Sequence, residues 1–292
     1  MTQVAFTLSA ATTLNSYGYS PHPLSSYLDW VYTLLSTPTS TGSLPKKPVI
    51  LSITSSDADE LEAMVSAIQG LRARLQRLAS AVNLGPACDP SGYIAIELNT
   101  SCPNIQHLPP PSYNFPSLTP LLHALASAFY ADPSLTIGLK LPPYLYATCF
   151  QEVVDTLAQF SRSRGGKPED QHSFINPFSF ITSINTLGSS LLFPEQVEHG
   201  DGFHAKFALP TPLGGLGGEA IHPIALGNVY TFSQLLAGHS DSALRGITIF
   251  GVGGVNSAAA AQRMVKAGAK VVGCATVLGQ SGVACFANLL NI

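Results

Sequence analysis

The chain has 292 residues, of which 46% are hydrophobic and only 11% are charged, so it can fill a sizeable core. Its net charge of -3, from 14 basic and 17 acidic residues without a basic run, argues against nucleic-acid binding. No apolar run approaches the roughly 20 residues of a membrane helix, and the start lacks signal-peptide features, so we expect a soluble, intracellular protein.

Strand-like and helix-like segments alternate along the chain. Strands are predicted at residues 48–53, 94–98, 136–141, 178–184, 247–250 and 270–273, and helices at 57–82, 117–130, 146–162, 223–236 and 258–267. Repeated strand-helix units predict parallel strands covered by helices. Strands that end in polar or glycine-rich loops favour a (β/α)₈ barrel over an open dinucleotide-binding sheet, although six strands are short of eight. We expect one domain over residues 1–292, with a polar surface insertion at 161–177.

The cysteines and histidines predict no metal site. The five cysteines are odd in number and show no Cys-x-x-Cys spacing, which argues against a disulfide framework and a cysteine-based zinc site. The eight histidines are dispersed, so we assign them surface or capping roles.

The most informative stretch is Glu-Leu-Asn-Thr-Ser-Cys-Pro-Asn at residues 97–104, directly after a predicted strand. Loops at strand ends carry the chemistry of many α/β enzymes. Asn99 and Asn104 can each donate and accept hydrogen bonds, and Cys102 can act as a nucleophile or a base in its thiolate form. From this chemistry alone, a packing role for Cys102 stays open.

Lys140 ends an apolar predicted strand. A lysine there is costly to desolvate unless it meets an anion or a polar ligand. Three readings stay open: a side chain that extends to the rim of the barrel, a Schiff-base lysine, or a fixed cation beside an electron-rich cofactor.

Two further segments carry amide and hydroxyl side chains that can bind a ligand. Asn15 is followed by Gly18, which permits close approach of the backbone to a ligand, although a simple turn is the alternative. Asn185 and Thr186 form an amide and hydroxyl pair at another strand end.

Two glycine clusters, at residues 214–218 and 251–254, precede predicted helices. Such glycines expose backbone N–H groups that can bind a phosphate, although tight turns alone would also explain them. The second cluster is not a Gly-x-Gly-x-x-Gly fingerprint, because Asn256 stands at the last position. A mononucleotide therefore suits it better than a dinucleotide.

Taken together and in this order, the motifs resemble the flavin-dependent dihydroorotate dehydrogenases, most closely the soluble class 1 enzymes with a cysteine base. The matching stretches are residues 99–104, 140–144, 185–186, 214–218 and 253–254. The resemblance implies a barrel that holds FMN and oxidises (S)-dihydroorotate to orotate in pyrimidine synthesis. It also implies fumarate as the favoured acceptor and a homodimer in the cytoplasm.

The resemblance also implies a role for each matching residue. Cys102 is expected as the catalytic base and Lys140 as a cation near the flavin ring. The expected substrate-binding residues are Asn15, Tyr17, Gly18, Tyr19, Asn99, Asn104, Asn185 and Thr186. The expected FMN-binding residues are Asn99, Lys140, Ile184, Gly217, Gly218, Gly253, Gly254, Ala275 and Thr276.

Two departures from the family leave alternatives. First, family members carry two further strands before the segment that matches Asn15, so we expect a barrel that is incomplete at its N-terminus. Second, Ala275 stands where the family usually has glycine. The alternatives are a catalytically silent or truncated relative that acts as a binding protein, and another dihydropyrimidine-type flavin oxidoreductase. A Schiff-base aldolase that uses Lys140 would leave the Cys102 loop unexplained.

Overall fold

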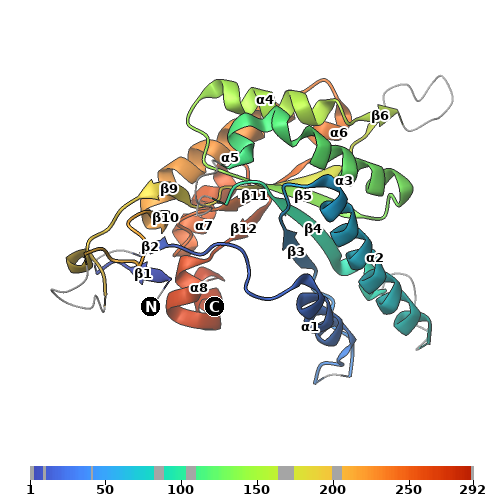
Figure 1. Cartoon of the computed structure of the whole chain (residues 1–292), viewed down its shortest axis with the longest axis horizontal. Helices are drawn as coiled ribbons and strands as arrows, with labels where there is room; N and C mark the ends of the chain where they lie inside the picture. The colour runs from blue at the N-terminus through green and yellow to red at the C-terminus, as the bar shows by residue number, and fades with distance from the viewer. Residues whose placement is uncertain are drawn as a thin grey trace.

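The computed structural model describes residues 3–8, 11–40, 42–81, 89–102, 110–163, 174–198 and 206–290. Its two main parts are a six-stranded parallel sheet flanked by helices and a four-stranded antiparallel sheet (Figure 1). Of the predicted insertion, the structure describes the ends: β6 (Arg162–Ser163) pairs with β7 (Phe174–Ile175), and the middle lies outside the described residues.

The parallel sheet confirms all six predicted strands. They are β3 (Val49–Ile53), β4 (Ile94–Asn99), β5 (Thr136–Leu141), β8 (Phe178–Ser183), β11 (Thr248–Val252) and β12 (Val271–Gly273). In space they follow the order of the chain, and every neighbouring pair is parallel. The connections between parallel strands are right-handed crossovers. Because the strand order never reverses direction, all these crossovers place their helices on the same face of the sheet, whereas a doubly wound sheet has helices on both faces. The sheet therefore curls as the wall of a barrel does, with β3 and β12 at its edges within the described residues.

The helices cover the convex face of this sheet (Figure 1). Five confirm the predicted ones: α2 (Ala58–Ala81), α3 (Thr119–Ala131), α4 (Ala147–Ala158), α5 (His222–Ala237) and α7 (Ala258–Lys266). Buried residues on α2 recur at helical spacing, as Leu61, Val65 and Ile68 show, and form one apolar stripe. On β4, alternate residues such as Ile96 and Leu98 are buried in the same core.

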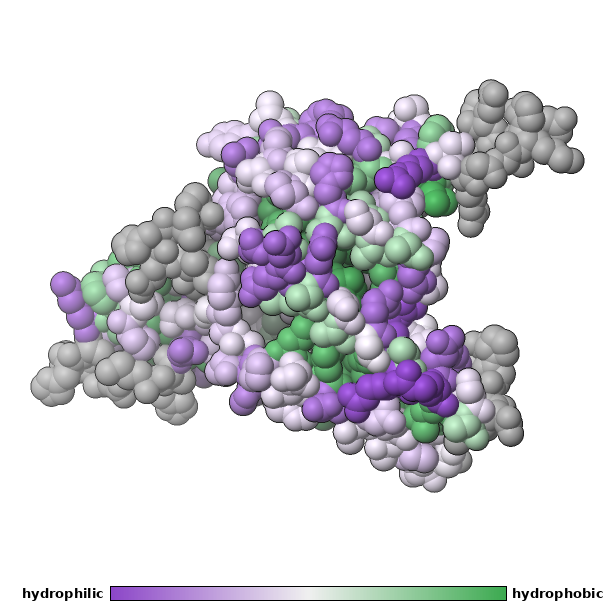
Figure 2. All heavy atoms as spheres, turned by 45° about the vertical axis from the view of Figure 1, so that its right-hand side comes forward, coloured by the Kyte–Doolittle hydropathy of each residue, from purple (hydrophilic) through white to green (hydrophobic). Residues whose placement is uncertain are grey.

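Shorter or unpredicted helices complete the chain. They are α1 (Leu24–Ser36), α6 (Ser242–Arg245), α8 (Thr276–Ser281) and α9 (Cys285–Leu290), with 3₁₀ turns η2 (Pro90–Tyr93), η3 (Pro111–Leu118), η5 (Pro194–Gln196), η7 (Glu219–Ile221) and η8 (Gly282–Ala284). Figure 2 shows mostly polar side chains on the outer surface, with apolar ones gathered in a hollow near its centre. Within the described ranges, every helix is too short or too polar to cross a membrane.

The antiparallel sheet was not predicted. It contains β1 (Val4–Phe6), β2 (Thr12–Asn15), β10 (Gly214–Gly218) and β9 (Leu187–Ser190), in that order in space. The glycine cluster expected as a loop is therefore a strand, β10. A Cβ atom on Gly218 would lie 2.1 Å from the carbonyl oxygen of Ala11, so two backbones approach more closely than any other residue allows.

The concave face of the parallel sheet is packed near its middle. The ring of Phe180 occupies the space beside Gly138, where a Cβ atom would come within 2.3 Å of it. Phe180 also stacks on Phe250 with a centroid distance of 4.7 Å. These aromatic rings fill the lower part of the concave face, and the polar residues at the carboxyl ends of the strands lie beyond them.

Candidate active site

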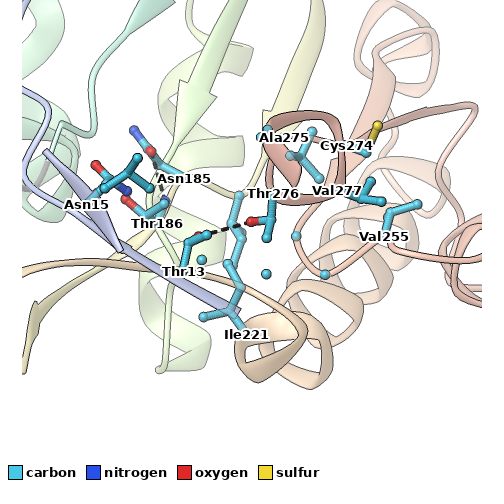
Figure 3. A pocket seen from close by; sticks show the side chains of 18 of the residues that line it. Thr13, Asn15, Asn185, Thr186, Ile221, Val255, Cys274, Ala275, Thr276 and Val277 are labelled. Carbon is cyan, nitrogen blue, oxygen red and sulfur yellow. Dashed lines mark hydrogen bonds between the residues drawn. The ribbon is translucent and has the colours of Figure 1, made fainter. Parts of the chain in front are cut away.

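A cavity of about 380 Å³ is lined by residues from both sheets and from the carboxyl ends of the parallel strands, a size within the usual range for ligand sites (Figure 3). It brings together all the site residues selected from the sequence except Tyr19 and Asn104. These are Asn15, Tyr17, Gly18, Asn99, Cys102, Lys140, Ile184, Asn185, Thr186, Gly217, Gly218, Gly253, Gly254, Ala275 and Thr276. Tyr19 is 59% exposed and is not part of the lining, and Asn104 lies outside the described residues.

The loop that carries Cys102 is anchored on the end of β5. The hydroxyls of Thr100 and Ser101 donate to the carbonyl oxygen of Lys140, at 2.8 and 3.0 Å, and both residues are buried. The Ser101 N–H donates to Asn99 Oδ1 at 3.2 Å. Because these bonds fix the two residues before it, Cys102 is held at the cavity wall as a half-buried free thiol.

Asn185, two residues after the end of β8, holds the same loop in place. Its Nδ2 donates to Ser101 Oγ at 3.0 Å, to the Ser101 carbonyl oxygen at 3.1 Å and to Asn99 Oδ1 at 3.3 Å. Its Oδ1 accepts from the Thr186 N–H at 2.8 Å. The amide group of Asn185 is thus engaged within the protein, whereas Asn99 Nδ2 has no hydrogen-bond partner within the described residues and can donate to a ligand.

Lys140 presents a positive charge at the cavity. It lies on β5 in register with Asn99 on one side and Thr182 on the other. Its side chain is half-buried, and no carboxylate of the described part of the chain lies within 4 Å of its ammonium group. A partly desolvated cation without such a partner favours an anionic or electron-rich ligand.

Hydroxyl groups gather around Gly217 of β10. Thr13 Oγ1 and Thr276 Oγ1 are 3.0 Å apart and join β2 to the start of α8 (Figure 3). A Cβ atom on Gly217 would lie 3.0 Å from Thr13 Oγ1 and 3.3 Å from Thr186 Cγ2. On the same strand pair, Asn15 Nδ2 donates to the carbonyl oxygen of Gly215 at 3.1 Å.

The turn after β11 requires two glycines. Gly253 has φ +129° and Gly254 has φ +67°, and both are in the region that side chains rarely adopt. A Cβ atom on Gly254 would lie 2.8 Å from the carbonyl oxygen of Gly218, which also lines the cavity. The glycines of β10 and of the turn after β11 therefore form one cradle of closely packed backbone.

Several lining residues were missed by sequence reasoning. Besides Thr13, they are Val4, Phe6, Ala11, Ile221, Val252, Val255, Asn256, Cys274, Val277 and Gly279. Most are apolar and carry no chemical signature, so only their position in the fold identifies them. Burial, with a smaller contribution from Cys285, raises the pKa of Cys274 to about 11, so this thiol is a neutral part of the wall. The described residues hold no cluster of histidine, cysteine and carboxylate side chains suited to a metal ion.

The chain is similar in sequence to known proteins. A family model described as dihydroorotate dehydrogenase matches residues 170–291. A putative dihydroorotate dehydrogenase A (fumarate) of Streptococcus equi subsp. equi is 29% identical over 280 residues, which cover 95% of this chain and 70% of that protein. A protein of the same name from Streptococcus pyogenes serotype M18 is 28% identical over 276 residues, covering 94% of this chain and 69% of the relative. The dihydroorotate dehydrogenase (fumarate) of Trypanosoma cruzi is 29% identical over 244 residues, or 84% of this chain and 62% of that protein. The chain is therefore similar to dihydroorotate dehydrogenases over most of its length, and the names of these relatives are of the fumarate type.

Proposed function

We propose that the chain is an FMN-dependent dihydroorotate dehydrogenase that oxidises (S)-dihydroorotate to orotate in pyrimidine biosynthesis, with fumarate as the electron acceptor. One observation carries the proposal: Cys102, Lys140 and the glycine cradle, selected from distant parts of the sequence, line the same cavity. In this proposal the curled sheet is part of a (β/α)₈ barrel, whose chemistry belongs at the carboxyl ends of the strands.

The lining of the cavity supports FMN as the cofactor. The cradle of Gly217, Gly218, Gly253 and Gly254 leaves no room for side chains and suits a phosphate with its ribityl chain. Lys140 would hold the electron-rich edge of the isoalloxazine ring, where a cation stabilises the reduced anionic form. When bound, FMN supplies a hydride acceptor for the oxidation.

The remaining residues would bind the substrate and move its proton. Sγ of Cys102, as the thiolate, would accept the proton from C5 of dihydroorotate. Asn99 and Thr186 line the cavity, and we assign the Asn99 amide and the Thr186 hydroxyl to the polar edge of the pyrimidine and its carboxylate. Asn185 would act mainly by holding Ser101, and therefore the base, in place.

The test is a steady-state assay of the FMN-loaded protein with dihydroorotate and fumarate. We expect orotate to form and its formation to depend on both substrates. Protein that binds FMN but forms no orotate would contradict the proposal. Oxidation of another dihydropyrimidine in preference to dihydroorotate would indicate a different oxidoreductase. We also propose that the protein is a homodimer in the cytoplasm. Sedimentation of the purified protein tests whether it is a dimer.

A further inference from the structure

A buried histidine lies directly behind the glycine cradle. His222 is the first residue of α5 and is only 6% exposed. It does not line the cavity, but its sequence neighbour Ile221 does (Figure 3). The assignment of all histidines to surface or capping roles is therefore wrong for His222, since its ring is buried and bonded to two other segments.

The two ring nitrogens of His222 contact different elements. Nδ1 lies 2.8 Å from the carbonyl oxygen of Gly253, in the turn after β11. Nε2 lies 3.2 Å from Nε of Arg263, on α7. The ring thus connects the start of α5 to the cradle on one side and to α7 on the other.

These contacts determine where the proton lies. A guanidinium group only donates hydrogen bonds, so Nε2 of His222 must accept and carries no proton. A carbonyl oxygen only accepts, so Nδ1 must carry the proton. Both bonds form together only in the neutral imidazole with its proton on Nδ1, and a second proton on Nε2 would face the Arg263 donor.

The same residue also packs against the second glycine of the turn. A Cβ atom on Gly254 would lie 2.5 Å from Cβ of His222 and 2.8 Å from the Gly218 carbonyl oxygen. The start of α5, the end of β10 and the turn after β11 therefore meet at Gly254. The charged groups on the elements around His222 are Arg263 and Lys266 on α7 and Glu219 on η7. The Glu219 carboxylate accepts a hydrogen bond from Asn256 Nδ2 at 3.2 Å.

We propose that His222 is the positioning residue of the phosphate seat: its neutral ring, oriented by Arg263, fixes the peptide of Gly253 so that the turn is ready for the FMN phosphate. This inference rests on the proposed function, because it assumes that the cradle binds FMN. It predicts that His222 affects the affinity for the phosphate end of the cofactor and has little effect on the isoalloxazine end.

The test compares FMN with riboflavin, which lacks the phosphate, by quenching of flavin fluorescence on binding. Replacement His222→Leu removes both hydrogen bonds, and we expect about tenfold weaker FMN binding with riboflavin affinity changed less than about twofold. His222→Asn places an amide donor near the position of Nδ1 and should restore most of the FMN affinity. The matched control is His239→Leu, a half-buried histidine that does not line the cavity and whose Nδ1 accepts from the Asp241 N–H.

A second measurement requires no flavin: nitrogen NMR of labelled His222 in the flavin-free protein should show a neutral ring with the proton on Nδ1. The opposite tautomer, or equal losses of FMN and riboflavin affinity in His222→Leu, would overturn the inference alone. If the wild-type protein bound neither flavin, the proposed function would fail and this role with it.

Discussion

Replacement of Gly254 by alanine is a sharp test of the cradle. The added Cβ atom would lie 2.5 Å from Cβ and 3.1 Å from Cα of His222, and 2.8 Å from the Gly218 carbonyl oxygen. Two of these three atoms belong to the backbone, so rotation of a side chain cannot relieve the contacts. The residue also has φ +67°, which is unfavourable for alanine.

The magnitude follows from these two effects. A left-handed conformation costs a residue with a Cβ atom about 1–2 kcal/mol. Forcing an extra carbon into a closely packed site typically costs about 1–3 kcal/mol. We therefore expect Gly254→Ala to lower the free energy of unfolding by about 2–5 kcal/mol. At about 2–4 °C per kcal/mol for large domains, the Tm should fall by roughly 4–20 °C.

The assay is thermal unfolding of the variant with and without FMN, beside a matched control. Gly227 lies within α5, and a Cβ atom on it would meet no atom within 4 Å. Gly227→Ala should therefore raise stability by about 0.5–1 kcal/mol through helix propensity alone, with unchanged FMN binding. Unchanged Tm and FMN affinity in Gly254→Ala would refute the reasoning, because they would mean that the backbone moves aside without cost.

The remaining predictions concern the base, the cation and a structural ion pair. Cys102→Ala should retain FMN but slow flavin reduction by dihydroorotate about 10²–10⁴-fold in stopped-flow absorbance, the usual contribution of a general base; an unchanged rate excludes Cys102 as the base. Lys140→Met should make the reduction potential of bound FMN more negative by about 30 mV, or roughly 1.4 kcal/mol for two electrons, in spectroelectrochemical titration; a more positive potential is inconsistent with our assignment. Burial of Asp132 raises its pKa, but hydrogen bonds from Ser134, Gln69 and Arg72 outweigh this effect and hold the pKa well below its usual range. The resulting stability is present above about pH 4 and is lost as the pH falls toward the folded-state value, so Asp132→Asn should lower the Tm at neutral pH and flatten its acid dependence. Because the Asp132 side chain is 37% exposed, solvent screens these interactions, and we expect a cost of about 1 kcal/mol or less. An acid dependence of the Tm as steep as that of the wild type would contradict this prediction.

The parallel sheet was predictable because its signals are local. Residues 94–98 form an apolar run bounded by turn residues, and the helix that precedes them has apolar residues at helical spacing. The site could be predicted for the same reason, since the carboxyl ends of neighbouring parallel strands meet at one edge. Asn99 and Lys140, selected separately, are indeed partners in register on β4 and β5.

The antiparallel sheet could not be predicted from such signals. The segment Gly-Gly-Leu-Gly-Gly has no alternation of apolar and polar residues, and its partner β2 lies about two hundred residues earlier in the chain, as the pairing of Gly215 with Asn15 shows. Thr13 was missed for this reason, because its hydroxyl reaches Thr276 only after these distant segments have paired. The hydrogen bond from Asn185 to Ser101 and the burial of the His222 ring likewise depend on tertiary contacts between segments far apart in the sequence.

The most direct test of the central claim is a single-turnover experiment on the FMN-loaded protein. Dihydroorotate is added under anaerobic conditions, without fumarate, while the visible absorption band of the flavin is followed. If the cavity holds FMN beside Cys102, the band should bleach fully on addition of about one equivalent of dihydroorotate and return when fumarate is added. A protein that binds FMN tightly but keeps its colour in excess dihydroorotate would contradict the claim.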